Sequence, residues 1–442
     1  MDKQQLKQRV WDAIDRRADE IIAFGRDVFQ HPELGYKEHR TAAKVADKFR
    51  ALGLDFQEGL AITGLKAGLK GKSAGPSVCV LGELDSVLCP GHPDADPLTG
   101  AAHSCVHNGQ LAMMLGVGMG LVDAGAAAHF GGDAVLIAVP AEEYVEIEYR
   151  ARLRREGKIS FLGGKQEYIL KGLMDDIDIT LMIHAMFEEG RGGQPQPQPK
   201  MGVGGTSNGF VGKFVKFTGR EAHSGAAPHE GINALNAAML GLFGIHAQRE
   251  TLRDDDTVRI HPIITKGGDL VNIVPADVRV ELYVRGKRME AIINAAAKVD
   301  RALQAGAMAV GAEVDIETLP GYLPKVSSPG LDALNRANAE AIVGKDEVGD
   351  RGHTTASGDL GDVSHLMPVA TLSVGGVKGQ GHSENVRIAD ENLSYVASAK
   401  VVAATVVDLL WDDAGQARKV IADYRPVYNK KSYLKMWEDL LR

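Results

Sequence analysis

Three short apolar segments, each ending in polar side chains, constrain the fold of this chain more than any other feature. They are SVCVLGELDSV (77–87), DAVLIAVPAEE (133–143) and DIDITLMIHAM (176–186). Apolar runs of this kind are typical of buried parallel strands, which present polar side chains at the carboxyl edge of their sheet. An apolar helical segment over 109–125 separates the first two. This alternation predicts a mostly parallel sheet covered by helices.

The segment 191–209, RGGQPQPQPKMGVGGTSNG, is rich in proline, glycine and glutamine and marks a domain boundary. After it the patterns run strand, helix, strand, strand, helix, strand, the order of a ferredoxin-like sandwich. From about residue 330 the earlier helix and strand pattern returns. We therefore expect an α/β catalytic domain with a mixed, mostly parallel sheet in two pieces, 1–203 and 319–442. An inserted ferredoxin-like α+β domain is expected over 204–318.

Composition argues against several classes of function. The formal net charge is −8, so the chain lacks the basic surface that nucleic acids require, and we expect no nucleic-acid partner. No segment reaches the roughly 18 uninterrupted apolar residues of a membrane span, and the charged N-terminal segment does not resemble a signal peptide. The 3 cysteines lack the spacing of a disulfide framework, which indicates a reducing compartment and a cytoplasmic protein.

Candidate metal ligands stand at strand ends and in loops of the expected catalytic domain. They are Cys105 and His107 in AHSCVHNGQ, Glu142 and Glu143 in PAEE, His184, and His382 in GQGHSEN. Each has an ordinary structural interpretation by itself: a core cysteine, a hydrogen-bonded core histidine, or glutamates on a solvated loop. Together they favour a metal site, because Cys, His and carboxylate ligands suit Zn or Mn, and one thiolate can bridge two ions.

The two adjacent glutamates have a further property. Neighbouring side chains at the end of a strand point in opposite directions, so one carboxylate can bind a metal while the other faces a water molecule. This arrangement suits a hydrolase that activates water.

Several motifs resemble, in order and approximate spacing, the dinuclear metal-dependent amidohydrolases. The motifs are HPELGYKEHRTA, AHSCVHNGQ, PAEE, the strand of His184, GREAHSGAAPH, NIVPADVRVELYVR, SGDLGDVSHLMP and GHSEN. That family includes hippurate hydrolase, the auxin-conjugate hydrolases and aminobenzoyl-glutamate hydrolase, within a larger clan of metal-dependent carboxypeptidases and dipeptidases. The resemblance covers nearly the whole chain, and the motifs are specific as a set.

The resemblance implies two divalent ions per chain, Mn or Zn, and a set of residues that hold them. The implied metal ligands are Cys105, His107, Glu143, His184 and His382. The same comparison makes Glu142 the general base and acid.

Four further residues receive roles from the resemblance. Asp85 matches an acidic position that orients a ligand from outside the metal shell; capping of a loop is the alternative. His223 matches a histidine of the inserted domain that, in homodimers of the family, reaches the active site of the partner. Asn272 and Arg285 match positions that contact the carboxylate of the substrate, and for Arg285 an ordinary surface charge on a strand is the alternative.

The chain departs from the family pattern around the candidate site. Val106 stands where family members usually have glycine, Asn108 where they have aspartate, and Gln110 where histidine is common. A charged segment over 144–175 replaces the usual glycine-rich one after PAEE. We expect this insertion at the mouth of the pocket, where it would bear on the choice of substrate.

The expected function is hydrolysis of a C–N bond in a small substrate that carries a carboxylate. The amide of an N-acyl or aminobenzoyl amino acid is the first choice, with Glu142 taking the proton of a metal-activated water. A hydrolytic deaminase that removes an amino group from an activated aromatic acid is the alternative. A non-catalytic metal-binding or ligand-binding relative ranks last, because the candidate ligands and Glu142 are all present. The resemblance also implies that the inserted domain serves as a lid and forms a homodimer.

Overall fold

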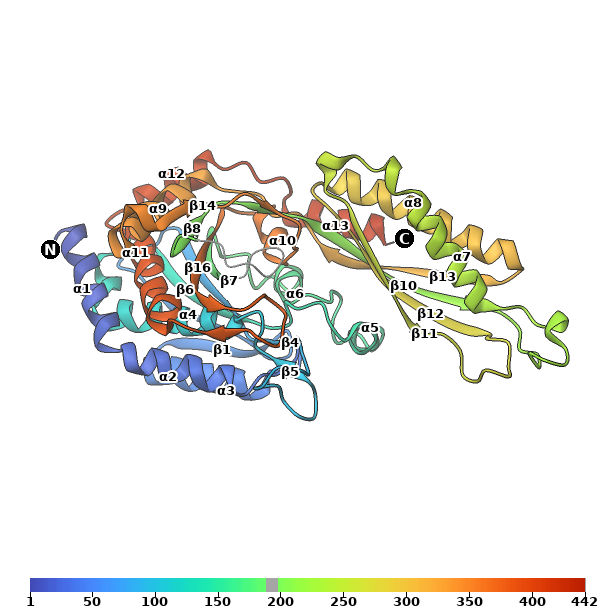
Figure 1. Ribbon diagram of the computed structural model, residues 1–442. Helices are drawn as coiled ribbons and strands as arrows, with labels where there is room; N and C mark the ends of the chain where they lie inside the picture. Colours follow the sequence, from blue (N-terminus) through green and yellow to red (C-terminus); the bar gives the residue numbers. More distant parts are fainter. Residues whose placement is uncertain (188–197, 442) are drawn as a thin grey trace. The chain divides into compact units, whose positions relative to one another are not determined.

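The computed structural model describes residues 1–187 and 198–441 (Figure 1). The chain forms two compact units. The first comprises Met1–Thr206, Val326–Gly352 and Asp362–Lys430, and the second comprises Ser207–Lys325, His353–Gly361 and Lys431–Arg442. The expected boundaries differ from these units mainly after residue 318, because the last long strand of the second unit continues to Tyr322. Two later segments of the chain also join the second unit.

The first unit is built on one mixed sheet, which has 9 strands within the described residues. The strand order is β1-β2-β6-β3-β7-β16-β8-β14, and β17 pairs with β16. The strands are β1 (Asp55–Leu60), β2 (Gly64–Leu69), β3 (Ser77–Glu83), β6 (Asp133–Val139), β7 (Ile179–Phe187), β8 (Met201–Val203), β14 (Val348–Asp350), β16 (Val369–Lys378) and β17 (Arg387–Ile388). The central strands β6, β3, β7 and β16 pair in parallel with one another, as expected for buried apolar strands.

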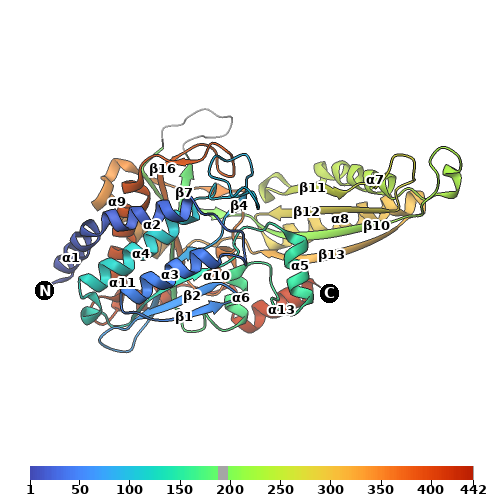
Figure 2. The same cartoon turned by 90° about the horizontal axis from the view of Figure 1, so that it is seen from below.

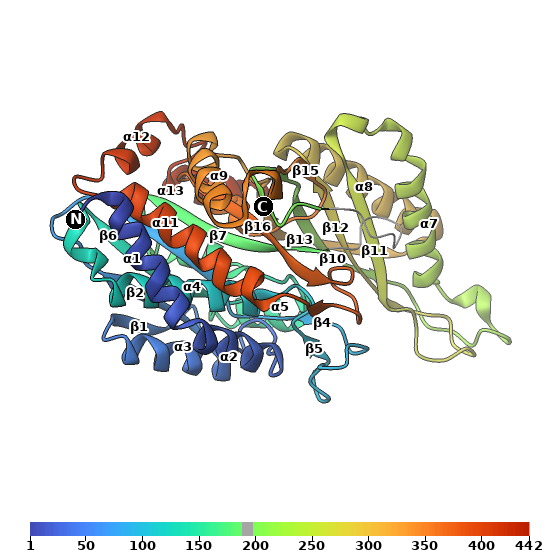
Figure 3. The same cartoon turned by 60° about the vertical axis from the view of Figure 1, so that its left-hand side comes forward.

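The first unit also contains helices. They are α1 (Lys3–Arg16), α2 (Ala18–Phe29), α3 (His39–Ala51), α4 (His107–Asp123), α5 (Ile147–Arg155), α6 (Gly164–Leu170), α9 (Pro329–Val343), α10 (Leu360–Ser364), α11 (Ser398–Leu410) and α12 (Gly415–Asp423). Figure 3 shows α1, α4 and α11 packed together over the sheet. Helix α4 is apolar on all sides and buried over nearly its whole length, as its continuous apolar sequence requires.

One apolar segment, Asn392–Leu410, is long enough to cross a membrane by length and composition. It comprises a short π-helical stretch and α11, and 83% of its apolar window is buried inside the protein. An apolar helix that is buried to this extent belongs to the core of the folded unit.

The second unit contains a sheet of four antiparallel strands in the order β11-β12-β10-β13, which Figure 2 shows side by side. The strands are β10 (Gly209–Thr218), β11 (Arg259–Lys266), β12 (Asp277–Gly286) and β13 (Glu313–Tyr322). Helices α7 (Ala234–Ala247) and α8 (Met289–Val310) pack against each other and against this sheet. Burial alternates along β12, with the apolar residues facing the helices. The expected fold class, α/β with an inserted ferredoxin-like domain, is confirmed.

Short elements complete the chain. Two two-stranded ladders pair β4 (Val87–Leu88) with β5 (Ala101–Ala102), and β9 (Thr206–Ser207) with β15 (His353–Thr354). Helix α13 (Lys430–Leu440) closes the chain.

Candidate metal centre

The carboxyl ends of β3, β6 and β7 meet at one edge of the large sheet. Glu83, the last residue of β3, pairs with Val139 at the end of β6. The chain continues from β6 directly into Glu142 and Glu143, while His184 lies in the last half of β7. Parallel pairing therefore brings together side chains that lie far apart in the sequence.

The turn before α4 supplies two further side chains. His107 is the first residue of the helix, and Cys105 precedes it by two positions. Val106 between them has a left-handed backbone (φ 66°), which glycine adopts without strain and a β-branched residue does not. This geometry explains why the family usually has glycine at this position. The helix begins at the site, so its positive end favours an anionic thiolate on Cys105.

Cys105, Glu143 and His382 form the first cluster of candidate ligands, which we call the Cys105 group. Their ligand atoms all lie within 4.8 Å of one another. His382 Nε2 lies 3.1 Å from Glu143 Oε1. The loop of His382 is held near the cysteine because the His382 backbone N–H donates to the Ser104 carbonyl at 2.9 Å. His184 is close by, with its Nε2 atom 3.7 Å from Cys105 Sγ.

Glu83, His107 and Glu142 form a second cluster, which we call the Glu83 group, with the same limit of 4.8 Å between ligand atoms. His107 Nε2 lies 3.0 Å from Glu83 Oε2 and 3.8 Å from Glu142 Oε2. It also lies 4.0 Å from Glu143 Oε1, so the two groups adjoin. The adjacent glutamates thus serve different groups, as expected for neighbouring side chains at a strand end.

Asp85 lies behind His107 and fixes its orientation. His107 Nδ1 is 2.9 Å from the Asp85 carbonyl oxygen and 3.2 Å from its carboxylate. A proton on Nδ1 satisfies these acceptors, so that loss of the Nε2 proton would leave a lone pair directed at the Glu83 group. The other Asp85 oxygen accepts the backbone N–H of Glu143 at 2.9 Å, so this residue also holds the loop of the two glutamates.

The chemistry of these atoms fits a metal ion. His107 Nε2 and Glu143 Oε1 are buried and make no hydrogen bond, although other polar atoms lie 3.0 to 4.0 Å away. Buried polar atoms without hydrogen bonds are costly and call for a partner. A cation bound between them would supply it, and thiolate, imidazole and carboxylate together suit Zn or Mn.

Mutual electrostatics shift the pKa values of the Cys105 group. Glu143 raises the pKa of His382 to about 12, against the opposing effect of burial. Burial raises the pKa of the Glu143 carboxyl, but His382 and His107 outweigh it and bring the value to about 2. Burial and Glu143 raise the pKa of the Cys105 thiol, yet His107 and His382 lower it to about 6. In the metal-free protein the group is therefore a cluster of ionised side chains at pH 7.

The departures from the family pattern have different consequences in the structure. The Asn108 side-chain amide donates to the Gly25 carbonyl and to the Tyr395 hydroxyl at 3.0 and 2.9 Å. Gln110 contacts one of the candidate ligands. Its amide nitrogen donates to the Glu83 carboxylate at 2.7 Å, and its oxygen accepts the Glu83 backbone N–H at 3.1 Å.

Two residues of this centre were missed by the sequence analysis. Glu83 lies two positions before Asp85 in GELDSV, and the abrupt change from an apolar strand to carboxylates was the signal that could have found it. Lys165 comes from α6 in the insertion after PAEE and pairs with Glu83 at 2.6 Å. The insertion was expected at the mouth of a pocket, but its second helix is almost completely buried.

The remaining predicted site residues, His223, Asn272 and Arg285, belong to the second unit. The exposed His223 Nδ1 accepts the backbone N–H groups of Gly225 and Ala226 at 3.2 and 3.0 Å, which directs Nε2 outward. Exposed Asn272 is held in the adjoining loop by a hydrogen bond from the Ser224 N–H to its carbonyl at 2.9 Å.

Arg285 lies on the face of β12 opposite the helices. Its guanidinium donates to the Ser357 hydroxyl at 3.0 Å. It also lies over the rings of Phe210 and Tyr283, at 5.3 and 5.4 Å from their centroids. Cation–π contacts of this kind hold a guanidinium in place.

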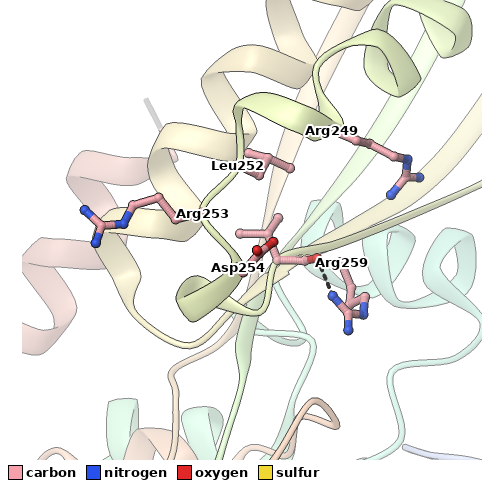
Figure 4. Close-up of a pocket in the computed structure, with 6 residues that line it drawn as sticks. Arg249, Leu252, Arg253, Asp254 and Arg259 are labelled. Carbon is pink, nitrogen blue, oxygen red and sulfur yellow. Dashed lines mark hydrogen bonds between the residues drawn. The ribbon is translucent and has the colours of Figure 1, made fainter.

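A surface pocket of about 350 Å³ in the second unit was a further candidate (Figure 4). Arg249, Arg253 and Arg259 are among its lining residues. Figure 4 shows Arg253 pointing away from the other two guanidinium groups. Arg249 and Arg259 donate to the backbone carbonyls of Ile260 and Val258. Because the three cations do not converge, we do not assign an anion site to this pocket.

Comparison with known proteins identifies the relatives of this chain. Residues 206–309 match the M20 peptidase dimerisation domain. The chain is similar to M20 peptidases and to amidohydrolases. The Xaa-Arg dipeptidase of Mus musculus is 26% identical over 92% of this chain and 90% of its own length. The indole-3-acetyl-aspartic acid hydrolase of Enterobacter agglomerans is 23% identical over 89% and 96%.

A solved structure shares the fold of this chain. The YXEP protein of Bacillus subtilis, described as a dinuclear metal-binding peptidase of the M20 family, superposes with a TM-score of 0.64 at 19% identity, covering 90% of this chain and 99% of its own. The resemblance inferred from the motifs is confirmed. The prediction of a hydrolase that acts on amide or peptide bonds is likewise confirmed at this general level.

Proposed function

We propose that this M20 relative is a metal-dependent hydrolase that cleaves a C–N bond in a small carboxylate substrate. The amide of an N-acyl or aminobenzoyl amino acid is the first choice. The observation that carries this proposal is the adjoining pair of ligand groups, with Glu142 and Glu143 divided between them. The existence of an indole-3-acetyl-aspartic acid hydrolase among the relatives supports an amide of this kind.

The Cys105 group, with His184 beside it, would hold one ion, and Glu83 and His107 would hold a second, which leaves Glu142 for the proton transfer. Mn and Zn suit the donor set. When bound, such ions supply Lewis acidity, which lowers the pKa of water and stabilises negative charge in the transition state.

The roles of the protein groups follow from their positions. The Glu142 side chain is 12% exposed, so its carboxylate can take a proton from the attacking water and later give it to the leaving nitrogen. Asp85 holds the His107 ring and the Glu143 backbone in place. His382 brings an imidazole to the Cys105 group from the loop that follows β16.

We assign substrate recognition and dimerisation to the second unit. Arg285 and Asn272 would bind the substrate carboxylate, and His223 would reach the active site of a partner chain. The match to a dimerisation domain supports a homodimer. Apolar side chains are also exposed on this unit, including Phe243 at 73% on α7 and Ile263 at 61% on the edge strand β11. We retain the cytoplasm as the proposed location.

One observation favours the deaminase alternative. The Arg285 guanidinium is held over two aromatic rings, Phe210 and Tyr283, an environment that also suits an aromatic acid. In that reaction water adds to an aryl carbon and ammonia leaves.

A substrate panel distinguishes the two reactions. N-acetyl, N-benzoyl and aminobenzoyl amino acids are assayed for release of the amino acid, alongside anthranilate-like aromatic amines assayed for ammonia. Activity on the acyl compounds alone supports the amidohydrolase. Ammonia release from an aryl amine replaces it with the deaminase, and inactivity on both sets with metal bound contradicts both proposals.

A further inference from the structure

Lys165 is a buried lysine at the candidate metal centre. It lies on α6, and its side chain is 1% exposed. Its Nζ atom is 2.6 Å from Glu83 Oε1, and the Glu83 side chain is only 2% exposed. A close ion pair with both partners withdrawn from water is held firmly, because bulk water does not reach either charge to hydrate it if the two separate.

The same carboxylate belongs to the Glu83 group. Its second oxygen, Oε2, accepts a hydrogen bond from Gln110 at 2.7 Å and lies 3.0 Å from His107 Nε2. Burial raises the pKa of the Glu83 carboxyl, but Lys165 and His107 lower it well below its usual range. Both oxygens therefore have protein partners before any metal ion arrives.

The Cys105 group differs in this respect. Glu143 has His382 and His107 within ion-pair distance. Among the residues that the structure describes, no lysine or arginine lies within that distance of Glu143. Imidazole nitrogens are themselves common metal ligands, whereas the Lys165 ammonium has donors and no acceptor, so it occupies the carboxylate oxygen that it contacts at 2.6 Å.

We propose that Lys165 makes the two metal positions unequal: its ammonium group competes for Glu83, so the Cys105 group binds a divalent ion tightly and the Glu83 group binds a second ion weakly. This inference rests on the proposed function only in requiring that the centre binds metal. Lys165 lies in the insertion after PAEE, so the proposal gives this insertion a role: its buried helix α6 places a positive charge beside Glu83.

The size of the effect follows from electrostatics. A unit positive charge a few ångströms from a divalent ion opposes binding strongly at the effective dielectric constant of a buried site. Removing it should raise the affinity of the second position at least about tenfold. It should also destabilise the metal-free protein, since Glu83 would lose its buried partner.

The test measures metal binding directly, by calorimetric titration of chelator-treated protein with Mn²⁺ and by competition with a chromophoric chelator for Zn²⁺. The variants are Lys165→Met, and Lys165→Gln, which retains a hydrogen-bond donor to Glu83. Lys171→Gln is the control, because Lys171 lies at the end of the same segment, is 43% exposed and pairs with Glu167 at 3.7 Å. Melting temperatures are recorded with and without Mn²⁺.

The wild type should bind two ions with affinities at least about tenfold apart. Both Lys165 variants should bring the second affinity closer to the first, and Mn²⁺ should raise their melting temperatures more than that of the wild type. Lys171→Gln should behave as the wild type. Two ions of equal affinity in the wild type, or variants with an unchanged second affinity, would overturn the role of Lys165.

If both Lys165 variants fail to fold, the titration of the wild type still tests the proposal, because it shows whether the two ions bind with unequal affinities. It also separates this inference from the proposed function. A folded wild type that binds no divalent ion contradicts the metal-dependent hydrolase itself. Two equal sites in an active enzyme contradict only the competition by Lys165.

Discussion

His107 and Asp85 form the best-defined contact of the candidate centre, with Nδ1 of the imidazole 2.9 Å from the Asp85 carbonyl oxygen. Both side chains are completely buried. The contact sets the tautomer of His107 and so decides which ring nitrogen can bind a metal. A residue outside both ligand groups thus governs one inside them.

Asp85→Asn should weaken metal binding about 10- to 100-fold, because the histidine loses its anionic acceptor and the Glu143 loop loses a hydrogen bond. Calorimetric titration with Mn²⁺ measures this change. Asp94→Asn is the matched control, since Asp94 is exposed in a nearby loop. Equal affinities for the Asp85 variant and the wild type would show that Asp85 only caps a loop.

Glu142→Gln and Glu143→Gln should have separable effects. The first should retain the ion of the Cys105 group and lose at least about two orders of magnitude in turnover, as expected for a general base. The second should lose that ion as well, because Glu143 belongs to the group. Metal content and turnover are measured on the same samples, with the exposed Glu156→Gln as a control. Reversed behaviour of the two variants would reverse the assignment.

Metal binding should release protons and weaken as the pH falls. At pH 7 the His382 imidazole of the metal-free protein is protonated, since Glu143 raises its pKa to about 12. Burial lowers the pKa of His107, but Glu83 and Cys105 raise it well above its usual value. Both rings must lose a proton to bind an ion, so about two protons should be released at this pH.

Below pH 6 the loss of affinity should become steeper. The Cys105 thiol has a pKa of about 6, so under more acidic conditions it too must release a proton on binding. Titrations in buffers with different ionisation enthalpies count the protons. An affinity that does not change between pH 5 and 8 would contradict coordination by these side chains.

Trans complementation tests the role proposed for His223. An inactive His223→Ala chain is mixed with an inactive Glu142→Gln chain, and subunit exchange is verified by mass. If His223 serves the active site of its partner, each heterodimer contains one site with both residues intact, and part of the activity returns. If the subunits exchange and no activity returns, His223 either acts in the active site of its own chain or takes no part in the reaction.

Much of the architecture could be predicted from local patterns. Apolar runs ending in carboxylates identified β3 and β6, and the run ending at His184 identified β7, because a buried parallel strand exposes polar side chains only at its end. The change of composition near residue 200 located the inserted unit. The later crossings of the chain into that unit could not be predicted, since they depend on contacts between distant segments rather than on local composition.

The sequence by itself determined which residue types reach the edge of the sheet. Strand periodicity and the turn at residues 105–107 each depend on only a few neighbouring residues. Only the tertiary structure decided how they are grouped. It placed Glu83, not identified as a ligand from the sequence, beside His107, and divided Glu142 from Glu143. It also brought Lys165 to Glu83 across 82 positions of sequence. Such a pairing depends on packing and the burial of charge, which no local pattern encodes.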